Sequence, residues 1–202
     1  MDVRNILSVP FVYDLFQWLI GNKKRHKILK NEYIGNVHNK KILELGCGTC
    51  DLLDLFEDCD YVGVDIDEKY IEKAKRRYRT RDNCTFICGD LNEFSSQIND
   101  RFDMILMMGV IHHITDDEVS KCFTICKKLL KEDGIFLTFD AVFVPGMSKF
   151  ERFLASKDRG KYVRNADEYV SIHKKNWSKV FYECRNDTMN LPFNIIIFKD
   201  GK

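Results

Sequence analysis

Short β-rich runs alternate with helical runs through the middle of this 202-residue chain, and this alternation restricts the fold more than any other feature. The helical stretches lie at about 50–57, 67–79 and 116–131. Regular β–α alternation is typical of a parallel sheet that helices cover. The sequence therefore predicts an α/β fold whose strands occupy residues 41–45, 61–66, 85–88, 103–108 and 135–139.

The chain on either side of this alternation has a different pattern. Residues 1–40 carry apolar side chains at helical spacing. Residues 141–178 contain no clear strand and many charged and aromatic residues. The β-rich runs at 179–184 and 193–198 are close enough to form a hairpin, so we expect an antiparallel pair at the end of one domain.

A glycine-containing turn, Glu44-Leu45-Gly46-Cys47-Gly48-Thr49-Cys50, joins the first predicted strand to a helix. Glycines at such a turn let a ligand approach the bare backbone. Asp65 ends the next strand, where an acid suits the two hydroxyls of a ribose. The dinucleotide pattern G-x-G-x-x-G fails because Asp51 occupies its third glycine position and would repel a pyrophosphate. The turn therefore favours a nucleoside ligand without a pyrophosphate and argues against a nicotinamide dehydrogenase.

These segments resemble the class I S-adenosylmethionine-dependent methyltransferases, in the small bacterial branch that acts on small molecules. The resemblance is firm over about residues 40–140. It rests on Glu44, Gly46 and Gly48 of the glycine motif, on Asp65 with Ile66, on Cys88-Gly89-Asp90-Leu91, and on the segment 102–113. Cys50 departs from the family motif, which has a third glycine at that position.

The resemblance implies a Rossmann-like, doubly wound sheet of seven strands in the order 3-2-1-4-5-7-6, with the last strand antiparallel. It implies that residues 1–40 form N-terminal cap helices and that 41–140 form the cofactor-binding core. Residues 141–178 would be a substrate lid insertion, and 179–202 the final antiparallel strands. The whole chain, 1–202, would be a single methyltransferase domain.

The same resemblance implies that S-adenosylmethionine is the cofactor and S-adenosylhomocysteine the product. Asp65 would hold the ribose, Asp90 the adenine, and the glycine turn the methionine moiety. The residues expected at the cofactor are Tyr13, Glu44, Gly46, Cys47, Gly48, Asp65, Ile66, Asp90, Leu91 and Met107.

The pair His112-His113 follows the fourth predicted strand, close to where the resemblance places the reactive methyl group. A hydroxyl acceptor needs a base, and histidine has a suitable pKa. Either histidine could act as that base, or the pair could brace the loop by hydrogen bonds. Asp140, at the end of the fifth strand, is an alternative base. In the lid segment, Arg159 and Arg164 could bind a carboxylate or phosphate of the substrate.

The cysteines do not form the pattern of a zinc site, so no metal is expected. Eight cysteines in a chain of this length are more consistent with reduced thiols than with a disulfide scaffold. Cys47 and Cys50 form a C-x-x-C, which could indicate a redox pair, but they lie inside the glycine motif. We interpret them as small residues of the turn.

Composition narrows the choice of partners. The formal net charge is +1, which gives no general attraction for nucleic acid. No apolar run reaches the roughly 20 residues that cross a bilayer, and no signal peptide is recognised, so we expect a cytoplasmic protein that binds neither membrane nor nucleic acid. The acceptor is expected to be a small molecule, and oxygen is expected as the methylated atom in preference to nitrogen or carbon. The alternatives are an RNA or protein methyltransferase and a non-catalytic, cofactor-binding relative. The oligomeric state stays open.

Overall fold

The computed structural model describes residues 22–98, 100–157 and 160–202. Its strands are β1 Lys41–Leu45, β2 Asp60–Asp65, β3 Cys84–Cys88, β4 Phe102–Met108, β5 Leu130–Phe143, β6 Arg164–Asn165, β7 Lys179–Arg185 and β8 Ile195–Gly201. Its α-helices are α3 Asn22–Ile28, α4 Glu68–Arg77, α5 Leu91–Gln97, α6 Asp116–Leu129, α7 Lys149–Lys157 and α8 Ala166–Asn176. Shorter helical turns are η1 Leu29–Ile34, η2 Asp51–Leu55 and η3 Ile111–His113.

The main sheet has the order β3-β2-β1-β4-β5-β8-β7. The first five strands are parallel, and β8 lies antiparallel between β5 and β7. Because β7 and β8 are the sixth and seventh strands that the sequence indicates, the predicted order 3-2-1-4-5-7-6 is confirmed. The chain order reverses between β1 and β4, which is where ligands bind in doubly wound sheets.

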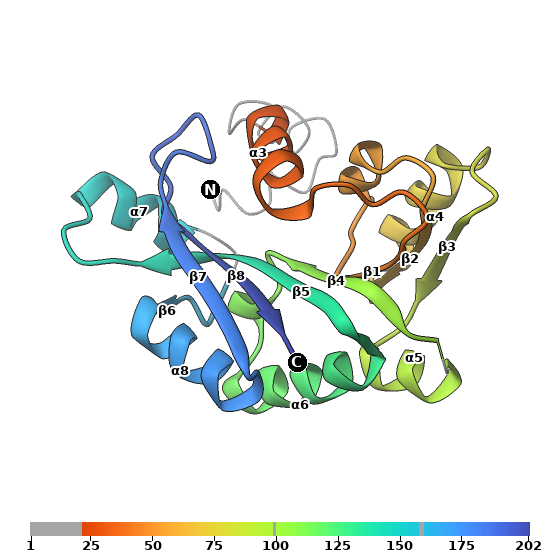
Figure 1. Cartoon of the computed structure of the whole chain (residues 1–202). Helices are drawn as coiled ribbons and strands as arrows, with labels where there is room; N and C mark the ends of the chain where they lie inside the picture. Colours follow the sequence, from red (N-terminus) through yellow and green to blue (C-terminus); the bar gives the residue numbers. More distant parts are fainter. Residues whose placement is uncertain (1–21, 99, 158–159) are drawn as a thin grey trace.

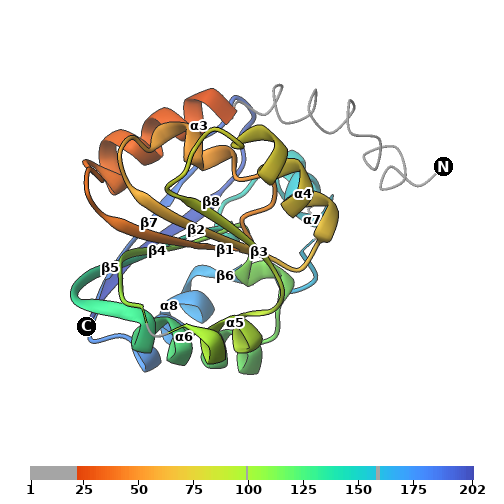
Figure 2. The same cartoon turned by 90° about the vertical axis from the view of Figure 1, so that its right-hand side faces the viewer.

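Helices cover both faces of the sheet. Helices α5, α6 and α8 lie on one face, and α3 and α4 lie on the other (Figures 1 and 2). Along β1, Ile42 packs into the core under α3 and α4, whereas Leu43 and Leu45 pack into the core over α5, α6 and α8. Burial on both faces explains why the parallel strands are continuous apolar runs in the sequence.

Capping residues fix where several helices begin. Thr115 and Glu118 form a capping box at the start of α6, in which each side chain accepts the other residue's backbone N–H. Asn165 and Glu168 form a second capping box, which starts α8 and was not predicted. Each box satisfies N–H groups that the first helical turn leaves without partners.

Several predicted boundaries are wrong. The strand expected at 135–139 is longer, because Leu130 already pairs with Phe102 and residues 131–134 bulge out before pairing resumes at Ile135. The helix expected at 50–57 is the shorter turn η2, and α5 was not predicted. The segment 141–178 was expected to lack a strand, but β6 pairs Arg164 with Val142 there.

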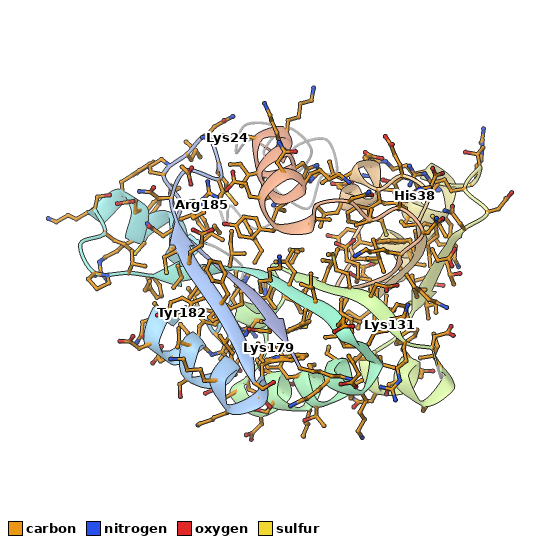
Figure 3. The ribbon with its side chains drawn as sticks, in the orientation of Figure 1. Lys24, His38, Lys131, Lys179, Tyr182 and Arg185 are labelled. Carbon is orange, nitrogen blue, oxygen red and sulfur yellow. The ribbon has the colours of Figure 1, made fainter. Side chains whose placement is uncertain are left out.

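The last strands are tied to the N-terminal side of the described chain. Arg185, at the end of β7, donates to Glu32 and to the Tyr33 hydroxyl of η1 (Figure 3). Its Nε also donates to Asp187 at 2.8 Å. These contacts hold η1 over the sheet near β7. Of the predicted cap region 1–40, the structure describes α3 and η1, and residues 1–21 lie outside the described part.

Candidate active site

The predicted site residues gather at one edge of the sheet, because parallel strands end at the same edge. Strand register aligns Leu45 of β1 with Val64 of β2 and with Met107 of β4. Asp65 is aligned with Cys88 at the end of β3. The loops that follow these strands carry the glycine turn, Asp90 and the histidine pair, so all of them face the same edge.

Positive backbone angles shape the glycine turn. Gly46 has φ +66°, and a Cβ there would lie 2.5 Å from Cγ2 of Val110, so the loop after β4 excludes any side chain. Gly48 has φ +53°, and a Cβ there would meet nothing within 4 Å. The N–H groups of Gly46 and Cys47 donate to the Val64 carbonyl at 2.8 and 3.1 Å. The turn is thus fixed to β2 and presents an open backbone surface at Gly48.

Asp65 organises the end of β2. Its Oδ2 accepts the Gly48 N–H at 2.8 Å, and its Oδ1 accepts the Asp67 N–H at 2.9 Å. A carboxylate has about four lone-pair sites, so Asp65 can still accept hydrogen bonds from two hydroxyls. The next side chain, Ile66, is 78% exposed, which leaves an apolar surface beside the carboxylate.

Asp90 has a structural partner as well as its predicted role. Its Oδ1 accepts the Glu93 N–H at 2.9 Å and so caps α5. The side chain is exposed, and Leu91 beside it is half-buried. Met107 differs from its neighbours on this edge, because its side chain is buried in the core over α5, α6 and α8. Only the backbone of Met107 can therefore reach a ligand at the sheet edge.

Glu44 lies behind the glycine turn as a buried acid. Only 4% of it is exposed, and the Tyr61 hydroxyl donates to its Oε2. Burial raises the pKa of Glu44 to about 7. Its charge at neutral pH is therefore sensitive to any cation that binds at this edge.

Cys50 stands in the left-handed region, with φ 58° and ψ 39°. This conformation costs a residue with a Cβ roughly 1–2 kcal/mol, which a glycine avoids. The thiols of Cys47 and Cys50 both pack against Gly63 of β2. A hydrogen bond with Cys50 and burial raise the pKa of the Cys47 thiol, which disfavours the reactive thiolate. All eight cysteines are free thiols.

His112, which follows β4, and Asp140 of β5 form a buried pair. Nδ1 of His112 lies 2.8 Å from Oδ1 of Asp140, which also accepts the His112 N–H at 3.2 Å. His112 is 5% exposed and Asp140 is 1% exposed. His113 is exposed, and its ring centroid lies 4.3 Å from that of His112. His112 and Asp140 are therefore a buried, hydrogen-bonded pair, and His113 lies outside that pair.

Comparison with known proteins agrees with this geometry. Residues 42–134 match the family model described as a methyltransferase domain. This segment therefore matches a methyltransferase domain.

Two curated relatives of this segment are named for different substrates. N-terminal Xaa-Pro-Lys N-methyltransferase 1 of Xenopus tropicalis is 32% identical over 133 residues, which cover 61% of this chain and 58% of the relative. An uncharacterised RNA methyltransferase of Clostridium acetobutylicum is 29% identical over 111 residues, covering 52% of this chain and 24% of the relative. The chain thus spans about a quarter to three fifths of the length of these relatives.

Solved structures share the fold at low sequence identity. A S-adenosylmethionine-dependent methyltransferase from Clostridium acetobutylicum superposes with TM-score 0.67 at 16% identity, with all of both chains covered. Mitomycin 7-O-methyltransferase superposes with TM-score 0.65 at 19% identity, covering 89% of this chain and 53% of that one. These likenesses confirm the methyltransferase fold.

Arg164 has a different place from the one expected for a substrate-binding residue of the methyltransferase. It is 7% exposed, and its guanidinium donates to Asp116, to the carbonyls of Ile111 and Ile114, and to that of Tyr162, at 2.8–3.0 Å. Each guanidinium nitrogen is used within the chain. We therefore do not retain Arg164 as a substrate ligand. Arg159 and Tyr13 lie outside the described residues.

Sequence reasoning missed two contributors to this site. Gly160 lies against His112, where a Cβ would come within 2.2 Å of the imidazole Cδ2, and the Tyr162 N–H donates to the His112 carbonyl at 2.9 Å. The Tyr78 hydroxyl lies 2.8 Å from the Cys50 carbonyl. Both contacts join segments that are far apart in the chain, so no local sequence pattern predicts them.

In the described residues, no group of three or more histidine, cysteine or acidic residues is arranged to hold a metal ion. Among the helices within the described ranges, none has both the length and the apolar character needed to cross a membrane.

Proposed function

We propose that this protein transfers the methyl group of S-adenosylmethionine to a hydroxyl oxygen of a small molecule. The observation that carries the proposal is the buried His112–Asp140 pair, at the sheet edge that also holds the glycine turn and Asp65. Residues 1–202 would act as a single methyltransferase domain, with 41–140 as the cofactor-binding core and 141–178 as the acceptor side.

The residues at the sheet edge fit the cofactor. The open backbone at Gly48 suits the methionine moiety, and Asp65 has hydrogen-bonding capacity left for the ribose hydroxyls. Ile66 and Leu91 would contact the adenine, and the free oxygen of Asp90 would accept from its amino group. When bound, the cofactor supplies a methyl group on a sulfonium that is already activated for displacement.

The chain's own contribution is to align the acceptor and remove its proton. If Nδ1 of His112 donates to Asp140, the neutral imidazole is the tautomer whose lone pair is on Nε2, which is the form that can accept a proton. Asp140 holds that tautomer and stabilises the imidazolium that forms when Nε2 takes the hydroxyl proton. Burial of the pair limits competing protonation by water.

The variant His112→Asn tests this role. We expect kcat to fall by roughly 10²–10⁴-fold toward a hydroxyl acceptor, because general base catalysis is lost. His38→Asn is a matched control, since His38 is exposed just before β1, at the other end of the strands (Figure 3). Equal rates for wild type and His112→Asn would contradict the base role and leave the histidine as a loop brace.

A protein N-terminal amine is the second candidate acceptor. The 32% identity to a N-terminal Xaa-Pro-Lys N-methyltransferase over 61% of this chain favours it. A radiolabelled methyl donor offered with a small-molecule hydroxyl panel, Xaa-Pro-Lys peptides and bulk RNA would separate the possibilities. Label in the hydroxyl panel alone supports the proposal, and label only in peptide or in RNA replaces it. A chain that binds the cofactor but labels nothing would be the non-catalytic relative.

A further inference from the structure

The glycine turn lacks the third glycine, and the structure shows what accompanies its loss. Cys50 holds the left-handed conformation at that position and is fully buried. Its N–H donates to the Cys47 carbonyl at 2.8 Å, which closes a tight turn around Gly48. A side chain there strains the backbone, so a contact from outside the turn is needed to keep Cys50 in place.

Tyr78, just after α4, supplies such a contact. Its hydroxyl lies 2.8 Å from the Cys50 carbonyl and 2.9 Å from Oδ1 of Asp54 in η2. Tyr78 is 6% exposed, and its ring stacks on Phe86 with centroids 6.0 Å apart. Arg77 reinforces the contact by pairing with Asp51 and Asp54. The hydroxyl is thus held rigidly against the end of the turn.

The turn that Tyr78 holds also aims a backbone donor at the ribose acid. Gly48 lies inside the closed Cys47–Cys50 turn, and its N–H donates to Asp65 at 2.8 Å. If Cys50 left the left-handed region, that turn would open and Gly48 would lose its fixed direction. The conformation of Cys50 is therefore connected to the geometry of Asp65.

We propose that Tyr78 is a positioning residue for cofactor binding, which holds Cys50 in the conformation that a glycine would adopt unaided. The inference rests on the proposed use of S-adenosylmethionine at this edge. Tyr78 contacts no reacting atom in this account and acts only through the turn.

The test is a double-mutant cycle read by calorimetric titration of the full chain with S-adenosylhomocysteine. In the Cys50 background, Tyr78→Phe should weaken affinity about fivefold, the worth of one hydrogen bond. In the Cys50→Gly background, the same change should weaken it less than about twofold, because glycine needs no support. Tyr70→Phe is the control, since Tyr70 is a half-buried tyrosine of α4, the helix that ends just before Tyr78.

Thermal melting of each variant shows that it is folded at the titration temperature. Equal affinity of wild type and Tyr78→Phe would overturn the inference, and so would an equal loss in both backgrounds, which indicates a general packing role. These outcomes leave the proposed function intact. Failure of the wild-type chain to bind S-adenosylhomocysteine would instead overturn the proposed function and the inference together.

Discussion

At the scale of single residues, buried carboxylates distinguish this protein. Glu44 lies behind the glycine turn with Tyr61 as its donor, and Asp200 pairs with the fully buried His173 at 2.6 Å. Burial raises the pKa of both acids. Glu44 therefore holds its proton at a pH where an exposed glutamate is ionised, and the stability of the fold depends on pH through it.

The variant Glu44→Gln tests this dependence. The folded pKa of about 7 exceeds the unfolded value of 4.5, so the contribution of Glu44 to stability is full below pH 4.5 and is lost as pH rises through 7. The shift corresponds to about 3 kcal/mol. In denaturant unfolding, the free energy of unfolding of Glu44→Gln relative to that of wild type should rise by about 3 kcal/mol between pH 4.5 and 7.5. A difference between the two that does not change with pH would contradict the buried, protonated state.

The sequence predicts residues of this site when a local motif carries them. Glu44, Gly48 and Asp65 follow from the glycine turn and the next strand end, and the structure places all three at one edge. Arg164 was misjudged, because a guanidinium that binds ligands and one that binds buried carbonyls look the same in sequence. Only the fold shows that its partners are at Ile111, Ile114 and Tyr162.

At the scale of elements, the short segment 160–165 is hydrogen-bonded to the loop that carries His112 and His113. Tyr162 donates its N–H to the His112 carbonyl, and Arg164 donates to the carbonyls of Ile111 at the start of η3 and Ile114 just after it. Strand β6 then joins the same segment to β5, and α8 begins at its capping box. The proposed acceptor side of the site is thus built from a segment that hydrogen bonds tie to η3 and that β6 ties to β5.

Removal of the Arg164 side chain should weaken the contact between segment 160–165 and the loop that contains η3. Arg164→Ala leaves three carbonyls without their donor, so we expect a loss of about 3 kcal/mol in unfolding free energy. For a chain of this size the melting temperature should fall by roughly 6–12 °C. The exposed neighbour variant Lys161→Ala should melt within about 1 °C of wild type. An Arg164→Ala melting temperature equal to that of Lys161→Ala would refute the structural role.

Strands and helices were predictable where burial makes their sequence mostly apolar. The parallel strands are recognisable because both faces are covered, as for Ile42 and Leu43 of β1. The early start of β5 at Leu130 was not predictable, because it depends on pairing with Phe102, which is distant in the sequence, and on a bulge. Helix α5 was missed because only Phe94 of its seven residues is an apolar residue in the core.

At the scale of the whole molecule, the chain reversal between β1 and β4 divides the site into two halves. Strands β1 to β3 carry the glycine turn, Asp65 and Asp90, which are the groups proposed for the cofactor. Strands β4 and β5 carry His112 and Asp140, which are the groups proposed for the acceptor. A methyl group would therefore move across the switch point of the sheet.

The most direct test of this account is calorimetric titration of the full chain with S-adenosylmethionine, beside Asp65→Ala and with NAD as the comparison ligand. We predict that wild type binds S-adenosylmethionine and not NAD. Asp65→Ala should bind at least about tenfold more weakly, because hydrogen bonds from a ribose to a charged acceptor are lost. Binding of NAD without S-adenosylmethionine, or equal affinity of Asp65→Ala and wild type, would contradict the assignment of this edge as the cofactor site.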